Sequence, residues 1–359
     1  MASVVNILIC SVLALVCYTC CGLPLAARVA SRSLAITLAP GVGWAVHSVV
    51  ALPLLFIFGM SRMAVAAVFV APLIAALTIQ WHDRGIPRHE GAFPRLIIVA
   101  LAAAALLAFA VMAAVLPKFT ADGVALASPI FDHSKVAMID EMVRLGVPPG
   151  NPFLGGVGNP TRLSYYYLWH FSAAELAVLA NISGWEADAG LTGFTAFGSL
   201  AAMIGFALWL SGRAGASLWV VALAATASLR PMLYALFGVD NAEQYVGYRS
   251  GFGGWLFQTS WAPQHTASAM CAVLAVVFLV ELIKRPRVLT LIVLAMTMAA
   301  SFESSTWIGG IVLPVAAAAA VVFFLVEAEP TARLRIVVYL AVAALLEFLL
   351  VSPFFYDQL

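Results

Sequence analysis

Residues 95–116 read RLIIVALAAAALLAFAVMAAVL, one arginine followed only by apolar side chains. A helix that crosses the hydrocarbon of a bilayer needs about 20 such residues. An α-helix satisfies its backbone hydrogen bonds internally, so a run of this kind is stable in lipid. We therefore predict a transmembrane helix here, and the rest of the chain repeats the pattern.

Composition supports a membrane protein. Of the 359 residues, 64% are hydrophobic and 10% are charged, whereas soluble domains carry about 45–50% apolar and about 25% charged residues. So little charge cannot cover a water-facing surface, which excludes a soluble enzyme. The 18 basic and 17 acidic residues give a formal charge of +1, so no nucleic acid is expected as a partner.

Apolar runs predict an all-α polytopic bundle of about ten spans. They lie near residues 4–26, 36–59, 62–80, 95–116, 190–211, 215–236, 265–283, 288–302, 307–326 and 336–353. We divide the chain into N-terminal helices (1–94), a core (95–285) with outer loops 117–189 and 237–264, and C-terminal helices (286–359). The first span lacks a preceding basic region, so we expect it to be retained as a span.

Eleven of the 18 basic residues fall in five short loops: Arg28 and Arg32; Arg84, Arg88 and Arg95; Arg213; Lys284, Arg285 and Arg287; Arg333 and Arg335. The positive-inside rule places such loops in the cytoplasm. All five share one side only if residues 163–181 do not cross the membrane. We therefore predict that this segment lies on the outer surface, with the N-terminus and both long loops outside.

The first long loop holds the most informative motif, IFDHSKVAMIDEMVRLGVPPGNPFLGGVGNPTRLSYYYLWH at residues 130–170. Asp132 and His133 precede an expected amphipathic surface helix at 135–145. Gly146 and the proline-rich run at 148–152 end that helix. Three tyrosines, at 165–167, then open the next helical segment.

An acidic residue past a span, a surface helix, a proline-rich turn and an aromatic helix entry together resemble the first outer loop of GT-C glycosyltransferases. The arrangement is most similar to the "YYY" family of uncharacterised membrane proteins related to the protein mannosyltransferases. In those enzymes the loop follows the first span, whereas here it follows the fourth. The resemblance therefore implies three additional N-terminal spans.

The resemblance also implies an activity: transfer of a sugar from a polyprenyl-phosphate donor to a glycan, lipid or protein acceptor. The reaction would occur on the outer face of a bacterial-type inner membrane. Asp132 matches the acidic residue that acts as general base on the acceptor hydroxyl, His133 would assist it, and Glu141 is a second candidate acid. Expected substrate contacts are Lys135, Arg144, Arg162, Tyr165, Tyr166, Tyr167, His170, Arg230, Glu243, Arg249, His265 and Glu303.

Simpler interpretations stay open for several of these residues. Asp132 can cap the surface helix, Asp140 and Arg144 can form an ion pair four residues apart, and the tyrosines can belong to an interfacial belt. The triplet Glu186-Ala187-Asp188 resembles one that holds a metal in some relatives of this family, but capping of a helix is favoured. No cofactor is predicted with support from the sequence, and a divalent metal stays open. A transporter or flippase of a lipid or polar solute is the alternative function.

Overall fold

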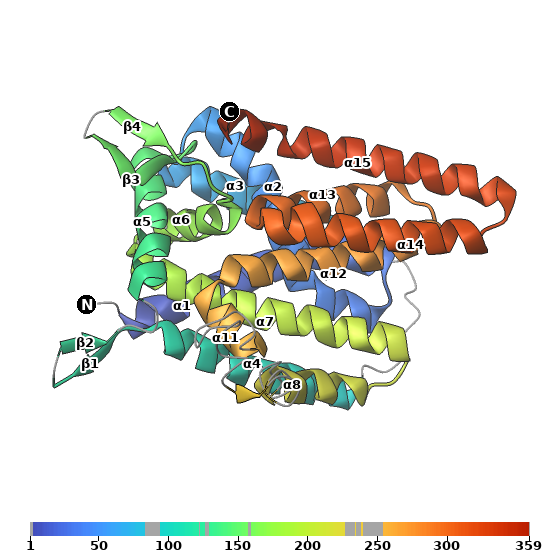
Figure 1. Ribbon diagram of the computed structural model, residues 1–359, viewed down its shortest axis with the longest axis horizontal. Coiled ribbons are helices and arrows are strands. Elements are labelled where there is room, and N and C mark those ends of the chain that lie inside the picture. Colours follow the sequence, from blue (N-terminus) through green and yellow to red (C-terminus); the bar gives the residue numbers. More distant parts are fainter. Residues whose placement is uncertain are drawn as a thin grey trace.

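The computed structural model describes residues 3–82, 94–121, 123–125, 129–156, 159–226, 234, 238–239 and 254–358. Long helices running side by side make up most of it (Figure 1). They are α1 (Val4–Val29), α2 (Arg32–Phe58), α3 (Arg62–His82), α4 (Arg95–Val115), α7 (Gly184–Ser211), α8 (Ala216–Thr226), α12 (Pro263–Lys284), α13 (Val288–Ser304), α14 (Leu313–Glu327) and α15 (Pro330–Gln358). The short helix α11 (Gly254–Trp261) precedes α12, and a π-helical turn, Ile308–Val312, leads into α14.

Within the residues that the structure describes, seven helical segments are long and apolar enough to cross a membrane. They are Val4–Val29, Arg32–Phe58, Arg95–Val115, Gly184–Ser211, Pro263–Lys284, Ile308–Glu327 and Arg333–Asp357. The predicted all-α architecture is thus confirmed, and the long apolar helices are consistent with a multi-pass membrane protein. The other three expected spans, at 62–80, 215–236 and 288–302, correspond to shorter apolar helices within the described residues.

The first two helices pack with their backbones in close contact. A Cβ atom built on Gly43 would lie 1.7 Å from the carbonyl oxygen of Tyr18, and one built on Gly22 would lie 2.0 Å from that of Ala39. No side chain fits at either position. Small residues of this kind allow close packing of helices in lipid, where dispersion contacts replace the hydrophobic effect as the driving force.

The helix α6 (Leu168–Ala180) differs from its prediction. It begins after the three tyrosines and is buried from Leu168 to Ala177, although a surface segment was expected at 163–181. It contacts α2, α3, α5, α7, α12 and α13, among others. With 13 residues it is too short to cross a bilayer, so it is a short helix buried at one end of the bundle.

Hydrogen bonds to α2 explain how α6 buries polar side chains. Trp44 Nε1 donates to Ser172 Oγ at 3.1 Å, and the Ser48 and Ser172 hydroxyls lie 2.9 Å apart. His47 Nε2 lies 3.3 Å from Glu175 Oε1. Buried polar groups are tolerated when they find such partners, and residues on α2 provide them.

The predicted surface helix is α5 (Pro129–Leu145), which lies across the end of the bundle (Figure 1). It packs on α6 and α7 through Val136, Ile139 and Met142. Two antiparallel hairpins flank it: β1 (Lys118–Thr120) with β2 (Gly123–Ala125), and β3 (Gly150–Gly156) with β4 (Asn159–Arg162). Both chain termini lie near this same end (Figure 1).

The glycine contact between α1 and α2 yields a stability prediction. Gly43→Val forces the two backbones apart, so we expect the free energy of unfolding to fall by about 1–3 kcal/mol or more. Denaturant titration of the purified protein in detergent micelles measures this change. Gly215→Ala is the matched control, because no atom of the described residues lies within 4 Å of a Cβ at that position. Equal stability of the two variants would contradict the packing argument.

Candidate functional site

Two carboxylates and one ammonium group meet inside the protein where α5 crosses α7. Lys135 Nζ lies 3.5 Å from Asp132 Oδ1 and 3.5 Å from Asp188 Oδ1. The three side chains are at most 3% exposed. We call these residues the Asp-Lys-Asp cluster.

The positions of these residues follow from local helix geometry. Asp132 and Lys135 are three residues apart on α5, so they share one face of that helix. Asp188 lies in the second turn of α7 and reaches them from the other side. Because α5 begins at Pro129, Asp132 is not its N-cap residue, and the capping alternative is wrong. Asp132 and Lys135 instead lie together in the predicted outer loop.

Burial makes this cluster energetically demanding. Charged groups out of water are stabilised only by close opposite charges and hydrogen bonds. With one ammonium between two carboxylates, the fully ionised cluster carries a charge of −1. Lys135 Nζ and Asp188 Oδ1 form no hydrogen bond with the described part of the chain, so the stabilisation that the structure shows for these two groups is the attraction across the 3.5 Å contacts.

His170 on α6 lies beside the cluster. It is fully buried, and neither of its ring nitrogens has a hydrogen-bond partner in the described part of the chain. Burial, followed by the nearby charge of Lys135, lowers the pKa of His170 to about 3. The ring is therefore neutral, with one nitrogen able to donate and the other able to accept a hydrogen bond.

Aromatic rings adjoin His170. Tyr165 stacks on Tyr166 with ring centroids 4.0 Å apart and presents an edge to His170 at 5.9 Å. Tyr166 Oη lies 3.5 Å from His265 Nε2, and His265 Nδ1 lies 2.8 Å from Ser305 Oγ. Burial raises the pKa of Tyr166, as does the Tyr165 hydroxyl. The tyrosines thus link α6 to the start of α12 and the end of α13.

The third tyrosine makes different contacts. Tyr167 Oη donates to Asp357 Oδ2 at 2.9 Å, and Arg162 Nη1 lies 3.6 Å from Asp357 Oδ1. Burial raises the pKa of Tyr167, and the charge of Asp357 adds to this effect. Tyr167 and Arg162 therefore anchor the end of α15.

Glu303, another predicted site residue, is buried, and its Oε2 has no hydrogen-bond partner in the described chain.

Other predicted site residues on α5 lie apart from the cluster. His133 is exposed and packs edge-on against Trp185, with ring centroids 5.5 Å apart. Glu141 pairs with Arg144 at 2.7 Å in an exposed ion pair. The expected pairing of Asp140 with Arg144 is therefore wrong.

Asp140 instead accepts a hydrogen bond from the Gly184 backbone N–H at 3.1 Å. Burial raises the pKa of Asp140, although that hydrogen bond opposes the shift. The carboxyl thus connects α5 to the start of α7.

The remaining candidates for substrate contacts, Arg230, Glu243 and Arg249, lie outside the described residues.

The acid triplet divides into two roles. Glu186 forms a capping box with Ser183 and also accepts from the Ser3 N–H at 2.7 Å, which confirms the capping interpretation. Asp188, which was not among the predicted site residues, completes the cluster. Residues two apart on a helix point about 200° apart around its axis, which explains why neighbouring acids serve different sites.

No group of three or more His, Cys, Asp or Glu side chains that could hold a metal ion occurs among the described residues. The Asp-Lys-Asp cluster provides two carboxylates, and its third member is a cation. Its donor set therefore suits a hydroxyl or another neutral hydrogen-bonding group better than a divalent ion.

The buried cluster yields a prediction for stability. Lys135→Met leaves two buried carboxylates without a counter-charge, so we expect the free energy of unfolding to fall by about 3–5 kcal/mol. Arg144→Met removes an exposed pair and should change it by about 1 kcal/mol or less. Denaturant titration in detergent micelles compares the two variants. Adding Asp188→Asn to Lys135→Met should recover part of the loss, and failure to do so would contradict the assigned pairing.

Comparison with known proteins gives one relative of undetermined role. The chain is 34% identical over 202 residues to the uncharacterised protein y4nK of Sinorhizobium fredii (strain NBRC 101917 / NGR234). The match covers 55% of this chain and 30% of y4nK, so the chain matches less than a third of that relative's length. No family model and no solved structure matches the chain.

Proposed function

We propose that the chain is a membrane glycosyltransferase that moves a sugar from a polyprenyl-phosphate donor to an acceptor hydroxyl. The observation that carries this proposal is the buried Asp-Lys-Asp cluster, with His170 and the Tyr165–Tyr166 pair close by. These groups gather at one end of an apolar bundle, where the phosphate of a lipid-linked donor lies at headgroup level. The acceptor remains a glycan, a lipid or a protein.

The proposed chemistry uses Asp132 as general base. Its carboxylate takes the proton of the acceptor hydroxyl while that oxygen attacks the anomeric carbon of the sugar. The bond from the anomeric carbon to the phosphate oxygen breaks, and the polyprenyl phosphate leaves as an anion. Lys135 Nζ lies 3.5 Å from Asp132 Oδ1, so the ammonium group holds this carboxyl in place beside the acceptor.

Sugar recognition is assigned to the neutral and aromatic groups. The rings of Tyr165 and Tyr166 offer an apolar surface for a sugar face. Neither ring nitrogen of His170 has a hydrogen-bond partner among the described residues, so both are assigned to sugar hydroxyls. His265, held by Ser305 at 2.8 Å, lies at the edge of the same group. In this proposal Asp188 orients Lys135, and Glu303 faces substrate hydroxyls.

The number, order and orientation of the membrane crossings are also part of the proposal, because the seven long helices do not define them. We infer about ten crossings, with α3, α8 and α13 as the shorter ones, in a GT-C-like order that has three additional N-terminal spans. The Asp-Lys-Asp cluster faces the extracytoplasmic side of a bacterial-type inner membrane. Support for this sidedness comes from the basic residues at the other end, including Arg28, Lys284 and Arg287.

One observation favours the alternative, a transporter of a lipid or polar solute. His47 and Glu175 form a fully buried pair at 3.3 Å between α2 and α6. Buried ionisable pairs in membrane proteins often mark proton or ion pathways. Loss of solute uptake in His47→Ala, with sugar transfer intact, would support this second function.

The catalytic proposal predicts the effect of Asp132→Asn. This variant keeps the shape of the side chain but removes the base, so we expect sugar transfer to fall about 10²–10⁴-fold. Transfer is measured in membranes that express the variant, supplied with lipid-linked sugar donors. The control is Asp140→Asn, the same change two turns further along α5, at a carboxyl that accepts from Gly184 N–H.

Lipid and glycan profiles of a deletion strain identify the donor and acceptor for this assay. Normal transfer by Asp132→Asn, with the protein present in the membrane at wild-type level, would overturn the role of Asp132. Wild-type activity of Asp140→Asn shows that loss in Asp132→Asn is not a general effect of removing charge from α5.

Sidedness is tested separately by labelling single cysteines. Phe153 is 58% exposed on β3, and Pro286 is exposed in the loop between α12 and α13. After the exposed Cys20 is replaced by serine, Phe153→Cys should react with an impermeant maleimide in intact cells. Pro286→Cys should react only after permeabilisation. The reverse pattern would place the Asp-Lys-Asp cluster in the cytoplasm.

A further inference from the structure

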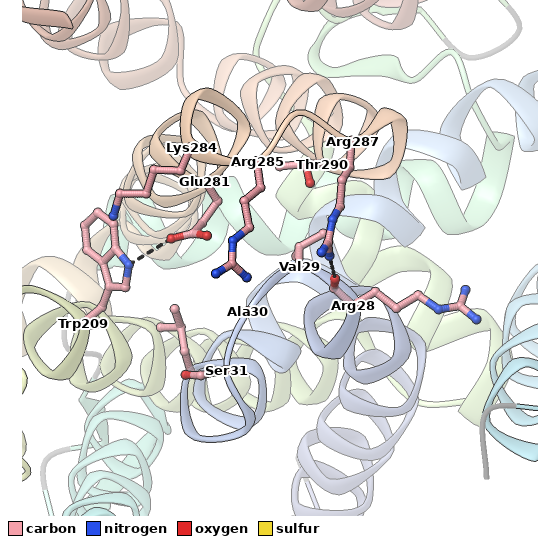
Figure 2. A pocket seen from close by; sticks show the side chains of 11 residues that line it. Arg28, Val29, Ala30, Ser31, Trp209, Glu281, Lys284, Arg285, Arg287 and Thr290 are labelled. Atoms are coloured by element: carbon pink, nitrogen blue, oxygen red, sulfur yellow. Dashed lines mark hydrogen bonds between the residues drawn. The ribbon is translucent and has the colours of Figure 1, made fainter. Parts of the chain in front are cut away.

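A second polar site lies where α1, α7 and α12 end and where α2 and α13 begin. It is a cavity of about 410 Å³ lined by side chains from all these elements. Figure 2 shows the residues around it, with α1, α7 and α12 all contributing from their C-terminal ends. The Asp-Lys-Asp cluster lies near the opposite ends of α7 and of the bundle, so the two sites are separate.

Positive charge dominates this cavity. Arg28, Lys284, Arg285 and Arg287 line it, against the single carboxylate of Glu281. If all five groups are ionised, the lining carries a net charge of +3. Four like charges around one space repel one another, and an anion that enters the space relieves this repulsion.

Lys284, Arg287 and the carboxylate of Glu281 are held by contacts within the protein. Arg287 Nη1 donates to the backbone carbonyl of Arg28. Lys284 Nζ lies 5.3 Å from the ring centroid of Trp209, and Trp209 Nε1 donates to Glu281 Oε1 at 3.3 Å. Figure 2 shows this hydrogen bond at one side of the cavity. The contacts fix the walls of the site.

Arg285 is different. No hydrogen bond or ion pair of its side chain occurs in the described chain. In Figure 2 its guanidinium projects into the space between Glu281 and the end of α1. A guanidinium has five N–H donors in a planar fork that matches the oxygens of a phosphate. Arg285 therefore presents donors to whatever occupies the cavity.

Hydroxyl and backbone groups add to the site. Ser31 and Thr290 line the cavity, and Thr290 is only 1% exposed. Ser31 is the N-cap residue of α2 and Arg287 that of α13, and neither makes a side-chain capping hydrogen bond. The starts of two helices thus add partial positive charge to that of the arginines.

We propose that this cavity binds the phosphate headgroup of an anionic membrane lipid. Its position at the ends of spanning helices places it at headgroup level, and Trp209 is a residue type enriched there. The positive-inside rule requires only that basic residues lie in the loops. It does not require that four basic residues line one concave site together with a buried hydroxyl. Basic pockets between spanning helices bind anionic headgroups.

The lipid is expected to have a phosphodiester without a compensating cation. Phosphatidylglycerol meets this requirement, whereas the ammonium group of phosphatidylcholine is repelled by the cationic lining. The acyl chains remain in the bilayer beside α1 and α12. This site is independent of sugar transfer at the other end of the bundle, so each proposal stands or fails alone.

The test uses the full chain, purified in a neutral detergent and titrated with phosphatidylglycerol or phosphatidylcholine. Apparent affinity is read from the rise in the unfolding midpoint and checked by native mass spectrometry. We expect phosphatidylglycerol to bind and stabilise the wild type and phosphatidylcholine to do neither. Arg285→Ala should weaken binding about fivefold, and Arg285→Ala with Lys284→Ala by more than that.

Arg213→Ala is the matched control, because Arg213 lies in the exposed loop between α7 and α8 and does not line the cavity. It should bind phosphatidylglycerol as the wild type does. Arg285→Lys keeps the charge and should recover much of the affinity. Because Arg285 is exposed and its side chain makes no hydrogen bond or ion pair with the described residues, its loss should not unfold the protein. The unfolding midpoint without lipid checks this.

Two results would overturn the proposal. Equal binding of phosphatidylglycerol by the wild type and by the Arg285→Ala, Lys284→Ala double variant would show that the cavity is not the site. A parallel titration with glycerol 3-phosphate distinguishes a soluble phosphate from a lipid. If glycerol 3-phosphate bound as tightly as phosphatidylglycerol, the ligand would be a soluble phosphate and the lipid assignment would be wrong.

Discussion

Hydrocarbon offers no hydrogen bonds, and this constraint organises the whole molecule. Every backbone amide within a bilayer must pair inside its own segment, so the long apolar runs become helices. Within the described chain, both β hairpins and the crossing helix α5 lie at one end of the bundle (Figure 1). The charged side chains of the Asp-Lys-Asp cluster lie at that end, and those of the basic cavity lie at the other end. The two polar sites are therefore at opposite ends, connected by helices that bury mainly apolar residues.

Periodicity and length were sufficient to predict most helices, because a span needs only an apolar run of the right length. They failed for α6, for which a position on the outer surface was predicted, although its Ser172 and Glu175 are buried. The missing information was on another helix: Trp44 and His47 of α2 hydrogen-bond these polar groups. Partners so distant in the chain cannot be found from local pattern.

The candidate site shows the same limit. Asp132 was predicted from its resemblance to the acidic residue of GT-C loops and Lys135 as a substrate contact, and the start of α5 at Pro129 places both on one helix. Asp188 was overlooked because its neighbour Glu186 fits a capping box, and the contact with Lys135 depends on how α5 crosses α7. The three tyrosines are predicted to open a helix together, but the chain at 165–167 is not helical. Tyr166 and Tyr167 therefore contact different partners, His265 and Asp357.

The helix α12 contributes to both sites, with His265 in its first turn and Lys284 at its end. Its 22 residues span about 33 Å at about 1.5 Å per residue, close to the roughly 30 Å hydrocarbon thickness of a typical bilayer. Bilayer thickness therefore decides whether both sites reach headgroup level at once. In a thinner membrane one end must protrude or the bundle must tilt, so lipid chain length becomes a variable that acts on both sites together.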